Sequence, residues 1–256
     1  MLLFTIVPLG IVVVYTFTDA SGAFTFGNLA SILDYAPIFF RSIWLSVAAT
    51  LICLIIGYPV AYTIANCKPK TQRMLQMLIM LPMCLSFLLR TLAWVAILED
   101  TGIINNFLAS IGIGRLSLIR NSGSVILGMV YNYLPYMILP LYTSISKIDK
   151  RYIEAGQDLG CSKRQIFTRV IFPLSLPGVT SGITMVFVPA VSTFYISQKL
   201  GSTGSVMVGD IIESQFKNSY NPNLGAAMAL LLMILIFICM GISNHFTRDD
   251  DEGGAV

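Results

Sequence analysis

The 256-residue sequence is short of charge for a protein of its length. Only 11% of its residues are Asp, Glu, Lys or Arg, while 55% are hydrophobic. A soluble domain carries about 25% charged residues, so this balance excludes an ordinary soluble domain and indicates a polytopic membrane protein. The net charge of +3 is too small to indicate nucleic-acid binding, and no cluster interleaves basic with aromatic residues.

Histidine and paired cysteine are also scarce. His245 is the only histidine, and the five cysteines stand singly without a C-x-x-C pattern. Neither a metal site nor a disulfide framework is therefore indicated. The sequence lacks the phosphate-binding G-x-x-x-x-G-K-[ST] loop, H-E-x-x-H and G-x-S-x-G. We expect no catalytic residue and no cofactor in this chain, which excludes an enzyme; ATP and Mg²⁺ would be bound by another polypeptide.

Apolar runs take the place of these motifs. The predicted membrane spans cover about residues 1–17, 43–65, 74–98, 123–146, 174–196 and 224–243. The first run lacks the basic start and cleavage pattern of a signal peptide, so we interpret it as a span, although it is short. The sequence thus predicts an all-α membrane protein with a six-span domain over residues 1–246. The acidic tail, residues 247–256, is expected to be disordered.

Basic residues divide unequally between the two sides of these spans. One side carries Lys68, Lys70, Arg73, Lys147, Lys150, Arg151, Lys163, Arg164, Arg169 and Arg248, and the other carries Arg41, Arg115, Arg120, Lys199 and Lys217. The side richer in Lys and Arg is normally cytoplasmic. Both termini and the loop between the fourth and fifth spans are therefore expected in the cytoplasm.

That loop, residues 147–173, begins with the pattern of a short helix. Apolar or small residues recur at helical spacing in Tyr152, Ala155, Gly156 and Leu159, which predicts one shared face. Gly160 follows where a helix commonly ends in a left-handed residue. We therefore expect the first helix to end at Gly160.

A second short helix is predicted directly after it. Ser162 and Gln165 have the spacing of a capping box, which would start this helix. Ile166 and Val170 contribute to its apolar stripe, and Pro173 is expected to stop it. Two short helices joined at a glycine, with basic residues on the polar side, would form a docking segment; the alternative is an ordinary amphipathic loop.

At these residues the sequence resembles the permease subunits of bacterial ATP-binding-cassette importers. Their cytoplasmic signature reads Glu-Ala-Ala, three residues, Gly, nine residues and Ile-x-Leu-Pro. The matching positions here are Glu154, Ala155, Gly160 and Pro173. Gly156 replaces the second Ala, Val170 the Ile and Phe172 the Leu.

The resemblance implies that the loop couples the chain to an ATPase. The residues implied in coupling are Glu154, Ala155, Gly156, Asp158, Leu159, Gly160, Ser162 and Pro173. It also implies a location in the bacterial cytoplasmic membrane and three kinds of protein partner: a second, homologous permease, two ATP-binding-cassette ATPase subunits and an extracytoplasmic substrate-binding protein.

Two further segments resemble the spermidine/putrescine permeases of this family. One is the S-x-x-x-R-T-x-A-W run from Ser86 to Trp94, and the other extends from Val188 through Phe194-Tyr195-Ile-Ser to Gly209-Asp210-Ile-Ile. A linear polycation needs aromatic faces and acids that do not hold it too tightly. The candidate residues of a polyamine pathway are Arg90, Trp94, Tyr131, Tyr133, Tyr136, Phe194, Tyr195, Asp210 and Glu213.

Plainer roles remain open for each of these residues. The aromatic residues would also serve in packing or in an interfacial belt, and the acids in a solvated loop. Arg90 would also extend to the outer interface or pair with an acid of a partner subunit. Another small solute, such as thiamine, iron or an amino-acid derivative, and an ATP-independent channel or carrier are the alternative functions.

Overall fold

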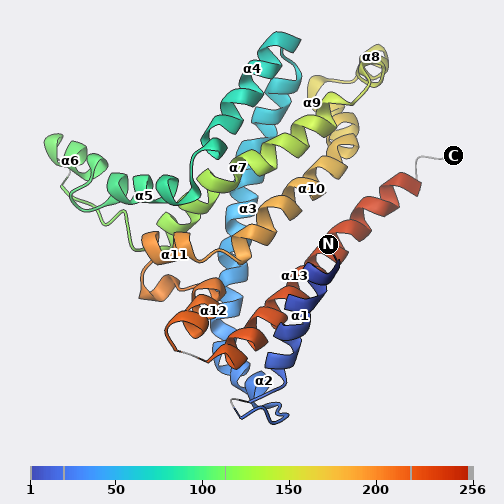
Figure 1. Cartoon of the computed structure of the whole chain (residues 1–256). Helices are drawn as coiled ribbons and strands as arrows, with labels where there is room; N and C mark the ends of the chain where they lie inside the picture. The colour runs from blue at the N-terminus through green and yellow to red at the C-terminus, as the bar shows by residue number, and fades with distance from the viewer. Residues whose placement is uncertain (1, 20, 113, 220, 253–256) are drawn as a thin grey trace. The chain divides into compact units, whose positions relative to one another are not determined.

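The structure is a computed structural model that describes residues 2–19, 21–112, 114–219 and 221–252. These residues are mostly helical, as predicted, and the bridge between Thr18 and Phe24 is the only strand-like pairing recorded among them. The helices (Figure 1) are α1 Leu2–Thr16, α2 Gly27–Ser31, α3 Ala36–Ala65, α4 Pro69–Met80, α5 Phe87–Leu98, α6 Ile103–Ser110, α7 Ser122–Ser146, α8 Lys150–Asp158, α9 Lys163–Ile166, α10 Phe172–Val191, α11 Tyr195–Leu200, α12 Val208–Lys217 and α13 Pro222–Glu252.

Four helical stretches are long and apolar enough to cross a membrane among the described residues. They are Gly27–Ala65, Ser122–Ser146, Lys163–Val191 and Pro222–Gly241. These stretches contain most of the predicted second, fourth, fifth and sixth spans. The predicted first span corresponds to α1, a shorter apolar helix.

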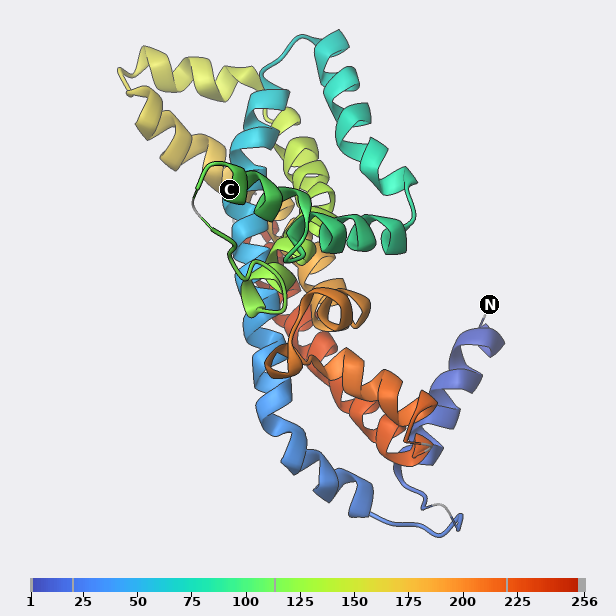
Figure 2. The ribbon, with the colours of Figure 1, turned by 90° about the vertical axis from the view of Figure 1, so that its left-hand side faces the viewer.

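The predicted third span, residues 74–98, is not one continuous helix. A 3₁₀ turn, Leu81–Cys84, follows α4, and the stretches Pro69–Cys84 and Phe87–Ser110 are bent by 87° (Figure 2). Pro82 offers no backbone N–H and its ring crowds the preceding turn, which favours a break here. The helix over the predicted third span is therefore bent, and both this span and the count of six spans stay predictions.

The helices that contain most of the last two predicted spans do not end where those spans were expected to end. The fifth was expected to reach residue 196, but α10 ends at Val191. The sixth was expected to end at residue 243, but α13 continues to Glu252. Residues 247–252, which we expected to be disordered, are thus helical, and residues 253–256 lie outside the described part of the chain.

Internal contacts divide the chain into two compact units. Unit 1 comprises Met1–Val47, Thr91–Gly128 and Pro189–Cys239, and unit 2 comprises Ala48–Arg90, Met129–Val188 and Met240–Val256. In unit 2, two small residues of α10, Gly178 and Gly182, let the backbones of α7 and α10 approach closely. An added Cβ at Gly178 would lie 2.9 Å from the Pro140 carbonyl oxygen, and one at Gly182 would lie 2.7 Å from Met137 Sδ.

Unit 1 has a comparable close contact where α12 begins. A Cβ added at Gly209 would lie 2.6 Å from the Thr193 carbonyl oxygen and 2.7 Å from that of Ser192. The backbone N–H of Val208 donates to Ser42 Oγ at 2.8 Å, which fixes the same turn to α3. The start of α12 is therefore held against the chain just beyond α10.

Replacement of Gly209 by Ala should destabilise unit 1. The new methyl group would meet backbone oxygens rather than flexible side-chain ends, so we expect a cost of about 1–3 kcal/mol. Gly204→Ala is the matched control, because a Cβ there would lie 3.5 Å from Ser202 Oγ, an ordinary contact. Thermal unfolding of the two purified variants should give a lower midpoint for Gly209→Ala only; equal midpoints would contradict the packing described here.

Candidate functional site

The coupling loop, residues 147–173, has the two-helix start that its sequence predicts. The Asp149 carboxylate caps α8 by accepting from the backbone N–H of Arg151 at 3.0 Å. Gly160 ends the turn with a φ of +74°. The N–H of Gly160 donates to the Gln157 carbonyl at 2.9 Å, and that of Cys161 donates to the Gly156 carbonyl at 3.0 Å. These bonds satisfy carbonyls that the end of α8 would leave without partners.

The second helix of the loop starts as predicted but does not stop as predicted. Ser162 and Gln165 form a reciprocal capping box, with the Ser162 N–H donating to Gln165 Oε1 at 2.8 Å. Beyond α9, the π turn Phe167–Ile171 leads directly into α10, of which Pro173 is the second residue. The wider π turn changes the pattern of backbone hydrogen bonds just before the proline. The helix therefore continues through Pro173 instead of ending there.

The predicted apolar face of α8 is divided between the protein interior and solvent. Gly156 is buried, and a Cβ there would lie 3.5 Å from Ile166 Cγ1. Tyr152 is 60% exposed and Leu159 is 84% exposed, and Glu154 is exposed as well. The loop therefore presents large apolar side chains next to an acid, which is the composition of a surface that docks a partner.

Of the other predicted coupling residues, Ala155, Asp158, Ser162 and Pro173 are all exposed. A cavity of ≈ 810 Å³ lies beside the loop in unit 2, with Tyr136, Pro140, Lys147, Tyr152 and Leu174 in its lining. Tyr136, predicted for the substrate pathway, thus lines the same cavity as residues of the coupling loop.

The remaining pathway candidates of unit 2 lie on α7 and α5. Tyr133 is buried and its ring centroid lies 6.5 Å from that of Tyr136, while Tyr131 and Tyr136 are each just over one-third exposed. Arg90 lies in the first turn of α5, and its Nε and Nη1 atoms are buried without a hydrogen-bond partner among the described residues. Trp94, one turn further along α5, belongs to unit 1.

Phe194 and Tyr195 lie outside the span in which they were expected. After α10 ends at Val191, the chain turns, Phe194 occupies the N-cap position of α11 and Tyr195 is its first helical residue. Ser192 and Thr193 are weak helix formers, and α12 packs against their carbonyls. Phe194 is 41% exposed, so its ring is available for contact.

Asp210, in the first turn of α12, has two carboxylate oxygens in different situations. Oδ2 accepts from the backbone N–H of Met207 at 2.7 Å and so caps the helix. Oδ1 is buried and has no hydrogen-bond partner among the described residues. Only 8% of the residue is exposed. Burial raises the pKa of Asp210 to about 6, against the lowering effect of the Met207 N–H and of the Ser197 and Gln198 side chains.

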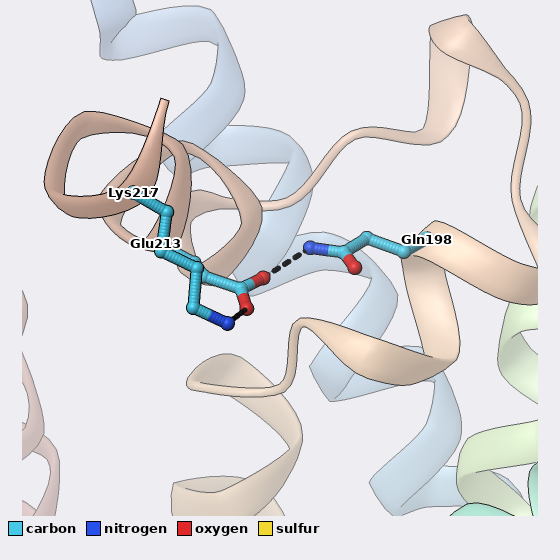
Figure 3. Close-up of polar contacts among 3 residues, drawn as sticks. All are labelled: Gln198, Glu213 and Lys217. Atoms are coloured by element: carbon cyan, nitrogen blue, oxygen red, sulfur yellow. Dashed lines mark hydrogen bonds and ion pairs between the residues drawn. The ribbon is translucent and has the colours of Figure 1, made fainter. Parts of the chain in front are cut away.

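Glu213, one turn along α12, is fully partnered. Lys217 Nζ lies 2.6 Å from Glu213 Oε1, and the Gln198 amide donates to Glu213 Oε2 (Figure 3). The bond to Lys217 lowers the pKa of Glu213. On α11, Lys199 Nζ lies 5.9 Å from the centre of the Tyr195 ring. Asp210 and Glu213 of the predicted set thus lie on one helix, α12, which contacts the helix that begins with Tyr195, α11.

Sequence reasoning missed three members of this cluster: Gln198, Lys199 and Lys217. The spacing of Glu213 and Lys217 is that of a favourable helix ion pair, so their bond was predictable. The spacing of Tyr195 and Lys199 is the same, but no strong rule places a lysine over a tyrosine. In the described part of the chain, no group of three His, Cys, Asp or Glu side chains is arranged to hold a metal ion.

The raised pKa of the buried Asp210 carboxyl group predicts that the effect of Asp210→Asn on stability depends on pH. The pKa of Asp210 is about 6 in the folded protein, against an ordinary value of 3.8 for an aspartate that is not buried. The folded chain therefore binds the carboxyl proton more tightly than the unfolded chain does. Its contribution to stability should therefore fall as pH rises through this interval and stay constant above about pH 7. Asn can keep the bond to Met207 without the buried charge, so the variant should gain stability relative to the original chain as pH rises.

Melting curves of both proteins at about pH 4.5 and about pH 8 check this sign. The unfolding midpoint of Asp210→Asn minus that of the original chain should be more positive at the higher pH. A difference that stays constant with pH would contradict a raised pKa at Asp210.

Comparison with known proteins identifies similar chains over most of this sequence. Residues 54–249 match the family model described as "binding-protein-dependent transport system inner membrane component". The spermidine/putrescine transport system permease protein PotB of Salmonella typhimurium is 35% identical over 229 residues, which cover 88% of this chain and 80% of that protein. PotB of Haemophilus influenzae is 35% identical over 252 residues, covering 93% and 88%.

A solved structure has the same fold at low sequence identity. It is a bacterial alginate ABC transporter in complex with a periplasmic protein bound to an alginate pentasaccharide. The match has a TM-score of 0.77 and 17% identity, and it covers 97% of this chain and 90% of that chain.

Proposed function

The chain belongs to the inner-membrane components of binding-protein-dependent transport systems, and we propose from this premise that it forms half of a polyamine pathway. It is a multi-pass membrane protein and a transporter subunit, not an enzyme. The proposed cargo is spermidine or putrescine. The observation that carries this proposal is the 35% identity to spermidine/putrescine permeases, which extends over most of both chains.

The proposed complex contains a second, homologous permease, two ATPase subunits and an extracytoplasmic binding protein. The alginate transporter of the same fold is recorded together with a periplasmic protein, which supports the last of these partners. ATP and Mg²⁺ would be bound by the ATPase subunits. The chain's own contribution is then to form part of the pathway and to receive the motion of an ATPase.

The coupling loop is the proposed site of contact with that ATPase. Its exposed Tyr152, Glu154 and Leu159 would enter a cleft of the partner, and the capping box with Gly160 would hold α8 and α9 at a fixed angle. The excess of basic residues on the side of the coupling loop supports a cytoplasmic location for it and for both termini.

The proposed transport mechanism is alternating access. ATP binding would close the ATPase pair, and the coupling loop would transmit this movement so that the two permeases expose the pathway to the outer side. The polyamine would then pass from its binding protein to aromatic and acidic side chains, with Phe194, Tyr195 and Asp210 as the foremost candidates. Arg90 and the α7 tyrosines remain candidates for the same pathway.

Gly160→Val tests the coupling assignment. A β-branched residue at a φ of +74° is strained, and distortion of the loop should sharply reduce ATP-dependent uptake and the amount of ATPase that co-purifies, while membrane insertion is preserved. Gly112→Val is the matched control, because Gly112 has a φ of +85° and nothing within 4 Å of an added Cβ, as is true of Gly160. Full uptake by Gly160→Val would reject the coupling role.

Uptake of labelled spermidine and putrescine into proteoliposomes containing the whole complex tests the function itself. We expect uptake that requires binding protein on one side and ATP on the side of the coupling loop. Stimulated ATP hydrolysis without polyamine flux would retain the importer and reject the cargo. Flux through this chain alone without ATP would reject both.

A further inference from the structure

We propose that Oδ1 of Asp210 is a binding site for a primary ammonium group of the transported amine. This inference rests on the proposed function and deepens it, because it assigns one atom of the pathway to one chemical group of the cargo.

The carboxylate of Asp210 is fixed in place by only one of its oxygens. Oδ2 accepts from the Met207 N–H at 2.7 Å, and this bond orients the group at the start of α12. Oδ1 has no hydrogen-bond partner in the described part of the chain, although the residue is 92% buried. A buried carboxylate oxygen without a partner is costly, and a proton or a cation removes that cost.

Of the two acids on α12, Asp210 is the one with a carboxylate oxygen that lacks a hydrogen-bond partner among the described residues. Glu213 already accepts hydrogen bonds from Lys217 and from Gln198 (Figure 3). The ammonium group of Lys217 therefore already neutralises the charge of this carboxylate. Other acids of unit 1, such as Asp34, Glu99 and Asp100, are exposed. The structure therefore separates one carboxylate with partners at both oxygens from one that has a buried oxygen without a partner in the part of the chain that it describes.

The surroundings of Oδ1 fit an alkylammonium group better than a metal ion. An ammonium group has three donors, and the side chains of Ser197 and Gln198 lie close enough to the Asp210 carboxyl group to lower its pKa by hydrogen bonding. The Ser197 hydroxyl donates to the Phe194 carbonyl, and the Gln198 amide N–H₂ donates to Glu213, so each side chain still has an oxygen that can accept. A divalent metal ion would need six or so oxygen ligands, and no group of three acidic, His or Cys side chains suited to a metal occurs among the described residues.

A neighbouring contact shows that α11 already holds an ammonium group on an aromatic face. Lys199 Nζ lies over the Tyr195 ring at 5.9 Å from its centre. A diamine with one ammonium group at Asp210 could place its chain or its second charge toward Tyr195, in exchange for Lys199. The site would thus recognise a chain with more than one positive charge.

Oδ1 is covered in this structure, so the amine must enter when α11 and α12 part. The hydrogen bond from Gln198 to Glu213 connects these two helices and would have to break. Binding that requires this opening would be weak enough to permit release, which a transport pathway needs.

The first test is Asp210→Asn in proteoliposomes of the complete complex. Asn has nearly the same shape and can still accept from Met207, so a purely capping role would be preserved, whereas the charge would be lost. We expect the ratio of spermidine transported to ATP hydrolysed to fall by about tenfold or more, the size of a lost charge-assisted hydrogen bond. Asp100→Asn, which removes an exposed acid of unit 1, should leave the ratio unchanged.

The outcomes separate this inference from the function on which it rests. Polyamine uptake by the original complex with an unchanged ratio in Asp210→Asn would overturn the inference alone. An original complex that transports no polyamine would overturn the proposed function and the inference with it.

A chemical-labelling experiment on the original complex does not depend on any variant. An apolar carbodiimide should modify Asp210, since it reacts with buried carboxyl groups, and peptide mass spectrometry would measure the extent. With the complex trapped by ATP and vanadate, spermidine should protect Asp210 and an equal concentration of a neutral diol should not. Equal labelling with and without spermidine would overturn the site.

Discussion

Backbone hydrogen bonding is the constraint on which the rest of this structure depends. In hydrocarbon no water satisfies a free N–H or carbonyl group, so an apolar chain must satisfy them within its own helices. Every departure from a regular helix must then be compensated. The π turn before Pro173, the 3₁₀ turn at Pro82 and the turn after Val191 are three such departures, and two of them lie next to predicted functional residues.

The π turn joins the second helix of the coupling loop to α10 without an interruption. Because it replaces the expected stop at Pro173, α9 and α10 form one helical stretch, Lys163–Val191, of 29 residues. One end of this stretch starts at the capping box of the coupling loop, and the other ends at the turn that precedes Phe194. In the proposed coupling, a displacement of the loop would be transmitted along this helix rather than absorbed by a flexible connection. The Gly209 contact then joins that turn to α12 and Asp210.

Local patterns were predictable from the sequence, and non-local ones were not. The left-handed Gly160 and the pairing of Ser162 with Gln165 depend on residues at most a few positions apart, and both occur as expected. The prolines show the limit: Pro59, Pro135 and Pro140 lie inside continuous helices, whereas a break occurs at Pro82. Which proline breaks a helix depends on compensating neighbours that spacing does not specify. The bond from Gln198 to Glu213 likewise exists only because α11 and α12 meet.

The two acids of α12, Asp210 and Glu213, differ in a way that the proposed transport pathway would require. A carboxylate with several fixed donors is stable but has little attraction left for a cation, as at Glu213. A carboxylate with none would have no defined orientation. Asp210 lies between these limits, because one oxygen is fixed by the Met207 N–H and the other is left for a partner. Its burial raises the pKa toward the physiological range, so an amine bound as proposed would relieve the cost of the buried charge.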